Sequence, residues 1–169
     1  DYAIIAVGAH NMEMPIPHDN SNIVSSWDVL NGQEVTGDCV VIGGGLVGAE
    51  TAEYLANKGH QVTIVEMMDK IAAGESTTVL PLMMKDFADH NVKQLVNTKV
   101  DHIENNIVYT ANDQIKADTI INALGSKKNI FDDSSITIPH VCVGDCSGER
   151  TADIASAIRT AYHAANEIG

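Results

Sequence analysis

The sequence is poor in aromatic residues and in cations. Aromatic residues make up only 4% of the 169, and 10 Lys and Arg face 23 Asp and Glu, for a formal net charge of -13. So few aromatic rings leave little material for stacking on bases or sugars. The negative charge repels phosphate backbones and anionic membrane surfaces. We therefore expect neither nucleic acid nor a membrane as a partner.

Cysteines and long apolar runs are scarce as well. The three cysteines, Cys39, Cys142 and Cys146, are an odd number at low density, which is typical of a reducing compartment and favours a cytoplasmic protein. Cys142 and Cys146 have neither the spacing of a C-x-x-C redox pair nor that of a metal knuckle, so we expect buried apolar thiols and no metal site. No apolar run reaches the length of a membrane span.

The sequence does contain alternating strand and helix patterns. A strand at 39–42, a glycine turn at 43–45, a helix at about 46–58 and a strand at 61–65 predict a βαβ unit with parallel strands. Further strands are expected at 2–7, 119–124 and 141–143, a helical turn at 25–30, a helix at 76–91, and an antiparallel meander built from 92–96, 100–103, 107–110 and 115–116. A last helix, 152–168, is expected to present one apolar face formed by Ile154, Ala157, Ile158, Ala161 and Ala165.

The glycine turn predicts a nucleotide site. Gly43, Gly45 and Gly48 form G-x-G-x-x-G between a strand and a helix. In this pattern the first glycine permits a tight turn, the second lets a pyrophosphate approach the backbone, and the third lets helix and strand pack closely. The amide groups that open the helix, at Leu46 and Val47, would hold the diphosphate. A close-packed turn without a ligand is the competing interpretation.

Glu66 supports the nucleotide interpretation. It ends the second strand of the unit, near the spacing of about 20 residues expected for the acid that binds an adenosine ribose. A carboxylate accepts from a free 2′-hydroxyl and repels a 2′-phosphate. The next residues, Met67 to Asp69, supply no Arg, and Lys70 is expected to be a solvated surface charge. The sequence therefore favours NADH over NADPH.

Four ordered motifs resemble the flavoproteins with two dinucleotide-binding domains, the glutathione-reductase-like fold. They are 1–9, the G-x-G-x-x-G-x-E form of 43–50, 117–125 and 139–145. The resemblance implies an NADH domain inserted into an FAD domain, with Glu50 near nicotinamide and flavin, Gly125 after the closing strand, and Gly144 and Asp145 at the ribityl chain of FAD. The implied fold is α/β, a Rossmann-like three-layer domain with a parallel sheet and a β-meander crossover, plus flanking pieces of an FAD domain. The corresponding boundaries are 35–122 for the NADH domain, 1–20 and 123–169 for the partial FAD domain, and 21–34 for a connector.

The last helix is similar to the C-terminal part of the 2,4-dienoyl-CoA reductase and 2-enoate reductase group. Those enzymes also carry an FMN-binding (β/α)8 barrel and an iron–sulfur cluster, which the resemblance places in domains outside this chain. The sequence has one G-x-G-x-x-G, whereas the FAD domain needs its own. We therefore expect a fragment of a longer reductase, whose missing part is its partner and which alone binds FAD poorly.

The expected function is to position NADH for hydride transfer to FAD, with electrons passing on to an enoate-type or related acceptor. No side chain of this chain is expected to donate a proton. Two alternatives stay open: a non-catalytic module that senses NAD(H) or another nucleotide, and a domain that has lost its ligand and serves as an interface.

Overall fold

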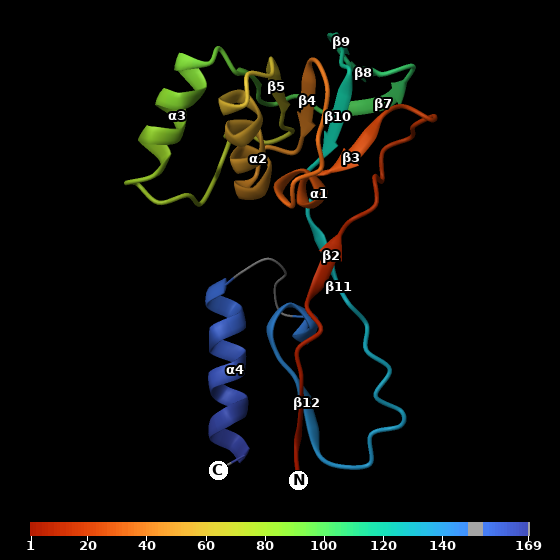
Figure 1. Ribbon diagram of the computed structural model, residues 1–169, viewed down its shortest axis with the longest axis vertical. Coiled ribbons are helices and arrows are strands. Elements are labelled where there is room, and N and C mark those ends of the chain that lie inside the picture. The colour runs from red at the N-terminus through yellow and green to blue at the C-terminus, as the bar shows by residue number, and fades with distance from the viewer. Residues whose placement is uncertain (149–153, 169) are drawn as a thin grey trace. The chain divides into compact units, whose positions relative to one another are not determined.

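The computed structural model describes residues 1–148 and 154–168, and the chain forms two compact units. The central unit is Glu13–Gly125, and the flanking unit joins Asp1–Met12 to Ser126–Gly169. Figure 1 shows the elements of both. No helix among the described residues has the length and apolar character that a membrane span requires.

The central unit is built on a five-stranded parallel sheet. Its strands, in spatial order, are β3 (Ile23–Ser25), β10 (Thr119–Asn122), β4 (Cys39–Ile42), β5 (Val62–Val65) and β6 (Lys93–Leu95). The helices of this unit are α1 (Ser26–Leu30), α2 (Leu46–Asn57) and α3 (Leu80–Asp89), and a three-stranded antiparallel meander consists of β7 (Val100–Glu104), β8 (Ile107–Thr110) and β9 (Gln114–Lys116). In Figure 1 the helices lie on one side of the sheet and the meander on the other.

Strand β4 shows why this part of the sequence is continuously apolar. All four of its residues are buried. Cys39 and Val41 belong to the core cluster under the helices, whereas Val40 and Ile42 belong to the cluster under the meander. A parallel strand covered on both faces needs apolar residues at every position. The three-layer Rossmann-like fold expected from the sequence is thereby confirmed.

The meander hairpin also follows from local chemistry. Asn105 and Asn106 connect β7 to β8 with φ angles of 52° and 59°. Two consecutive left-handed residues are the requirement of a type I′ hairpin turn, and asparagine tolerates that conformation better than most residues. The predicted hairpin at this pair is confirmed.

Two predicted segments differ from the structure. The segment 92–96 was expected in the antiparallel meander, but β6 pairs with β5 in parallel, with Thr63 opposite Lys93. The segment 21–34, expected as a connector with a helical turn at 25–30, contains that turn as α1, which begins at a Ser25 cap, and also contains the strand β3, which pairs with β10. Both strands have only three residues, and so short a run carries no period that reveals its partner.

The flanking unit contains two small strand pairs and one long helix. β1 (Ala3–Ile5) pairs in parallel with β12 (His140–Cys142), β2 (Ala9–Asn11) pairs antiparallel with β11 (Ser126–Lys128), and the 3-10 helix η1 (Gly144–Ser147) precedes α4 (Ile154–Ile168). Positions 152–153 of the expected last helix lie outside the described residues.

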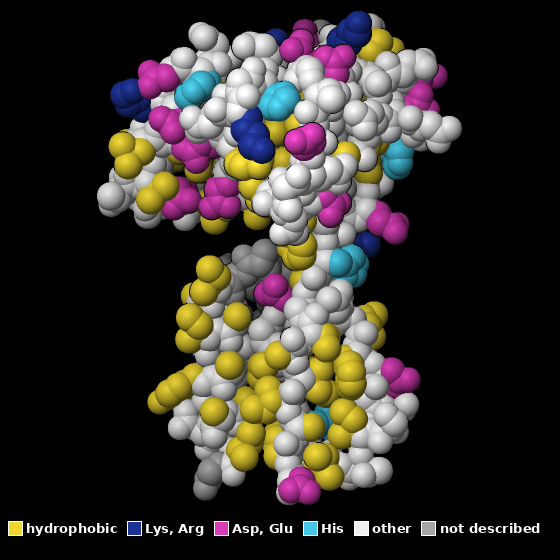
Figure 2. All heavy atoms as spheres, in the orientation of Figure 1, with side chains coloured by type: hydrophobic (Ala, Val, Ile, Leu, Met, Phe, Trp, Pro, Cys, Tyr) yellow, Lys and Arg dark blue, Asp and Glu magenta, His cyan; other side chains and the backbone are white. Residues whose placement is uncertain are grey.

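Helix α4 does not bury the face expected from its sequence. Ile154 and Ile158 are 80% and 66% exposed, whereas Ser156 and Ala164 are buried. The Thr160 hydroxyl, on the same stripe as Ser156 and Ala164, accepts a hydrogen bond from the Gly144 amide at 2.8 Å. Small residues let the helix approach η1 closely, and Ile154 and Ile158 are not covered by other residues of this chain. Figure 2 shows many hydrophobic side chains on the surface of this unit.

Candidate dinucleotide site

The carboxyl ends of all five parallel strands lie at one edge of the central sheet, because the strands run in the same direction. In open α/β sheets ligands bind outside this edge. The glycine turn follows β4 at this edge, and Glu66 follows β5. The parallel register therefore brings the two predicted features to the same side of the sheet.

Two glycines of the turn are required by packing. Gly43 has a φ of 101°, and a Cβ there would lie 2.5 Å from the Ala123 carbonyl oxygen. A Cβ on Gly48 would lie 1.9 Å from the Gly43 carbonyl oxygen. No side chain fits at either distance, so these glycines let α2, β4 and the end of β10 approach one another.

Gly45 differs from the other two glycines. Its φ is -64°, and a Cβ built on it would meet nothing within 4 Å. Neither backbone strain nor protein packing therefore demands glycine at this position. The open space beside Gly45 is where a bound group would approach the backbone.

The start of α2 offers amide groups to such a ligand. Gly45 is the N-cap and provides no side-chain hydrogen bond. The first amides of a helix, here including those of Leu46 and Val47, have no intrahelical acceptor, and they lie at the positive end of the helix dipole. This arrangement is suited to an anion such as a diphosphate.

Glu66 ties the glycine turn to the end of β5. It is only 8% exposed. One carboxylate oxygen accepts a hydrogen bond from the Gly44 amide at 2.6 Å, and the other accepts from the Met68 amide at 2.7 Å. The Gly44 carbonyl in turn accepts from the Ala72 amide at 2.7 Å. Each carboxylate oxygen keeps a second lone pair, which a ribose hydroxyl can use.

A cavity of about 480 Å³ opens at this edge. Its volume falls within the range of about 300–1,000 Å³ that is usual for ligand pockets. Of the predicted site residues, Gly43, Gly45, Glu66 and Gly125 line it. Further residues complete the lining: Pro15, Ile16, Ile42, Val65, Met67, Met68, Thr98, Lys99, Val100, Ala123 and Leu124.

The segment Thr98 to Val100 was missed because β6 was placed in the meander. Once β6 is recognised as a parallel strand, the rule that ligands bind beyond the carboxyl ends of strands points to the residues that follow it. Pro15 and Ile16 were missed because the segment 1–20 was assigned to the other domain. Lys99 is a cation of this lining that lies far from the glycine motif in sequence.

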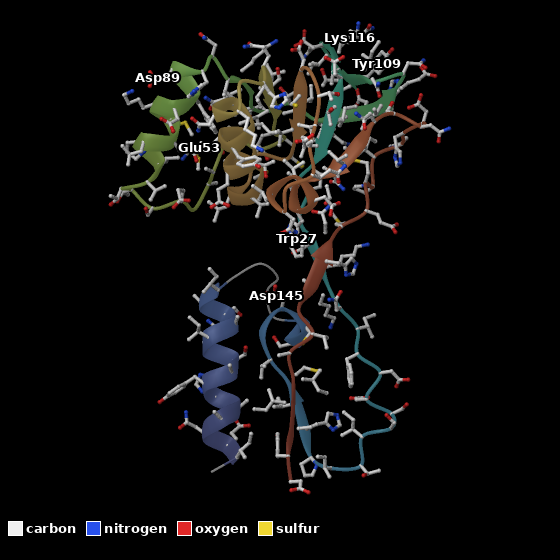
Figure 3. All side chains as sticks on the ribbon, viewed as in Figure 1. Trp27, Glu53, Asp89, Tyr109, Lys116 and Asp145 are labelled. Atoms are coloured by element: carbon white, nitrogen blue, oxygen red, sulfur yellow. The ribbon has the colours of Figure 1, made fainter. Side chains whose placement is uncertain are left out.

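Glu50 lies on α2, beyond the first turn of the helix. It is the fifth residue of the helix and is exposed, and the first turn holds no acid. Glu53, close to one turn further on, faces α3 (Figure 3). Burial raises the pKa of the Glu53 carboxyl, and the neighbouring Asp86 of α3 and Glu50 raise it further.

Gly144 and Asp145 belong to the flanking unit, whereas the other eight predicted site residues belong to the central unit. Gly144 has a φ of 69°, and Asp145 lies in η1 (Figure 3). These two residues form one turn ahead of α4. The described residues contain no group of three or more acids, histidines or cysteines placed to hold a metal ion.

The central unit fits a dinucleotide. It provides an open approach at Gly45, uncapped amides at the start of α2, a cavity of sufficient volume and a buried carboxylate with free lone pairs. A diphosphate and a ribose are groups that such features can hold.

Comparison with known proteins gives a consistent result. The family model described as pyridine nucleotide-disulphide oxidoreductase matches residues 1–140. The bilirubin reductase of Mediterraneibacter gnavus is 44% identical over 177 aligned positions, which cover 99% of this chain and 28% of that protein. The NADH oxidase of Thermoanaerobacter brockii is 47% identical over 78 residues, 43% of this chain and 12% of that protein.

A solved structure shows the same fold. A 2-naphthoyl-CoA reductase in complex with 2-naphthoyl-CoA matches with a TM-score of 0.83 and 27% identity, over 96% of this chain and 26% of that one. The chain thus spans less than a third of the length of each of these relatives.

Proposed function

Because the chain belongs to the pyridine nucleotide-disulphide oxidoreductase family, we propose that its central unit binds NADH and positions it for hydride transfer to FAD. Members of this family use FAD and NAD(P)H. The observation that carries the proposal is the open glycine turn next to a cavity bounded by Glu66. The chemistry supplied there is the transfer of a hydride from nicotinamide C4 of NADH to N5 of the flavin.

In this proposal the chain contributes binding and orientation. The amides at Gly45, Leu46 and Val47 hold the diphosphate, and Glu66 accepts from the adenosine ribose. The apolar side chains of Ile16, Met68 and Val100 exclude water from the adenosine half of the cavity. Positioning of this kind lowers the entropic part of the barrier without a proton donor.

The remaining contacts would come from Glu50, near nicotinamide and flavin, and from Gly144 and Asp145, near the ribityl chain of FAD. We further propose that the chain works within a longer reductase of the 2,4-dienoyl-CoA and 2-enoate reductase type, with FMN and an iron–sulfur cluster in other domains. The names of two similar proteins, a bilirubin reductase and a 2-naphthoyl-CoA reductase, support an unsaturated organic acceptor.

The alternative is a module that senses NAD(H) without chemistry. The two proposals differ in a spectroscopic readout. NADH added under anaerobic conditions to the longer reductase in which we expect this chain to work bleaches a flavin absorption band if hydride transfer occurs. A longer protein that binds NADH but contains no flavin favours the sensor.

The test of the site itself is Gly45→Val. The position has open space and an ordinary φ, so the variant should keep its thermal stability while the added side chain blocks the diphosphate. Isothermal titration calorimetry with NADH should show at least a tenfold weaker affinity, about 1.4 kcal/mol. Ala111→Val, which adds similar bulk at an exposed turn of the meander, is the control and should bind NADH normally. Normal binding by Gly45→Val would refute the site.

A further inference from the structure

Two cysteines of the flanking unit, Cys142 and Cys146, are neighbours of the same residue, Ile5. Cys142 is the register partner of Ile5 in the β1–β12 pair. The thiol of Cys146 donates hydrogen bonds to the Ile5 carbonyl at 3.4 Å and to the Val143 carbonyl at 3.1 Å. Both cysteines are free thiols. The same backbone position on β1 therefore has both of them as neighbours.

The turn between the cysteines explains this proximity. In an extended chain the Cα atoms of residues four apart would be separated by about 13 Å, whereas a disulfide needs about 4.4–6.8 Å. Gly144, with a φ of 69°, turns the chain at the end of β12, and η1 then folds it back toward β1. The spacing in the sequence does not by itself bring the sulfurs of Cys142 and Cys146 together. The turn at Gly144 and η1 does so.

The surroundings distinguish the two thiols. Cys146 is buried, at 7% exposure, whereas Cys142 is partly exposed. Burial is the largest cause that raises the pKa of the Cys142 thiol. The charge of Cys146, a hydrogen bond with Cys146 and the charge of Asp133 raise this pKa further, whereas the charge of Lys128 lowers it. The Lys128 ammonium lies beside Gly148, since a Cβ built on that glycine would be 2.9 Å from it. A cation is therefore adjacent to this turn.

We propose that Cys142 and Cys146 are a reversible thiol modification site, which low-molecular-weight disulfides convert to an internal disulfide. The more accessible Cys142 sulfur, as the thiolate, attacks one sulfur of the small disulfide and releases one small thiolate. The Cys146 thiol then loses its proton and attacks the Cys142 sulfur, which releases the second small thiolate. Two protein thiols and one small disulfide thus become one protein disulfide and two small thiols.

The third cysteine provides an internal reference. Cys39 is 1% exposed in β4 of the central unit. Burial first, then the charges of Asp38 and Asp118, raise the pKa of its thiol to about 11. Cys39 is therefore inaccessible to a small disulfide, unlike the partly exposed Cys142, and should remain reduced when the pair is oxidised.

Peptide mapping of the purified protein tests the proposal. The protein is equilibrated with glutathione disulfide, alkylated under denaturing conditions and digested with trypsin, which separates a peptide of residues 129–150, holding both cysteines, from one of residues 1–58, holding Cys39. We expect the first peptide to carry no alkyl group, to be two hydrogen atoms lighter and to regain two alkyl groups after reduction. Two alkylated thiols after oxidation, or a glutathione adduct on each, would overturn the proposal.

A second measurement separates the effect of the fold from that of mere closeness in sequence. A synthetic peptide of residues 129–150 is titrated with the same glutathione mixtures. The folded protein should be half-oxidised at a ratio of the squared glutathione concentration to the glutathione disulfide concentration at least about tenfold higher than the ratio that half-oxidises the peptide. Equal ratios would show that the fold does not bring the thiols together. In the matched variants, Cys146→Ser should stop at a glutathione adduct on Cys142, and Cys142→Ser should leave Cys146 reduced.

Discussion

At the scale of single residues, Glu66 has a structural task as well as its proposed part in binding. Its two carboxylate oxygens hold the amides of Gly44 and Met68, at a position that is almost fully buried. The acid that is proposed to bind ribose therefore also fixes the shape of the glycine turn. Its identity is constrained even in the protein without a ligand.

This double task predicts the effect of Glu66→Gln. A glutamine side chain has one acceptor oxygen, so either the Gly44 or the Met68 amide loses its partner. A buried amide left unsatisfied costs about 1–3 kcal/mol, which thermal unfolding of the protein without NADH should reveal. NADH affinity should fall as well, because the turn relaxes.

Glu104→Gln on the exposed side of β7 is the matched control, and it should change neither quantity. An unchanged melting temperature for Glu66→Gln would mean that the two amide contacts do not stabilise the turn.

At the scale of elements, the site depends on how closely α2 approaches β4. Gly43 and Gly48 allow this approach, whereas a Cβ at Gly45 would contact no other atom. The three glycines look equivalent in the motif, but the structure assigns them two different physical roles.

The pair Gly48→Ala and Gly45→Ala tests this distinction. At Gly48 the new Cβ would lie 1.9 Å from a backbone oxygen, so α2 must shift and the protein should lose at least about 1–3 kcal/mol of stability. At Gly45 the new Cβ meets nothing, and the free energy of unfolding should stay the same or rise slightly. Chemical denaturation of both variants measures the difference, and equal stabilities would contradict the assigned roles.

Sequence patterns predicted some elements better than others. The β4–α2–β5 unit was predicted because β4 is continuously apolar, β5 is apolar at three of its four positions, and glycines flank the helix. The strand β6 was assigned to the wrong partner, because three residues cannot indicate whether the neighbouring strand is parallel. Because of this error, the predicted site did not include Thr98, Lys99 and Val100, which line the cavity.

At the scale of the whole molecule, the cavity belongs to one unit. All of its lining residues lie between Pro15 and Gly125, within the central unit Glu13–Gly125. The parallel sheet and both of its core clusters lie in the same range. The proposed NADH site therefore takes all of its lining residues from the central unit.

This arrangement predicts that residues 13–125, expressed alone, fold and bind NADH. The isolated unit should unfold cooperatively and show the same NADH dissociation constant by calorimetry as the whole chain, because a domain with its own core folds independently. A unit that folds but fails to bind would show that the flanking residues complete the site.

The sequence by itself determined the glycine turn, the buried strands and the acid at the end of β5, because each depends on local backbone geometry or on local burial. Only the tertiary structure decided which strand β6 pairs with and that Pro15 and Lys99 line the same cavity. It alone also decided that the Glu66 carboxylate accepts hydrogen bonds from the amides of Gly44 and Met68. It also decided that α4 packs through Ser156 and Ala164 rather than through its isoleucines. Contacts between residues far apart in the chain depend on strand pairing and close packing, and no local pattern encodes these.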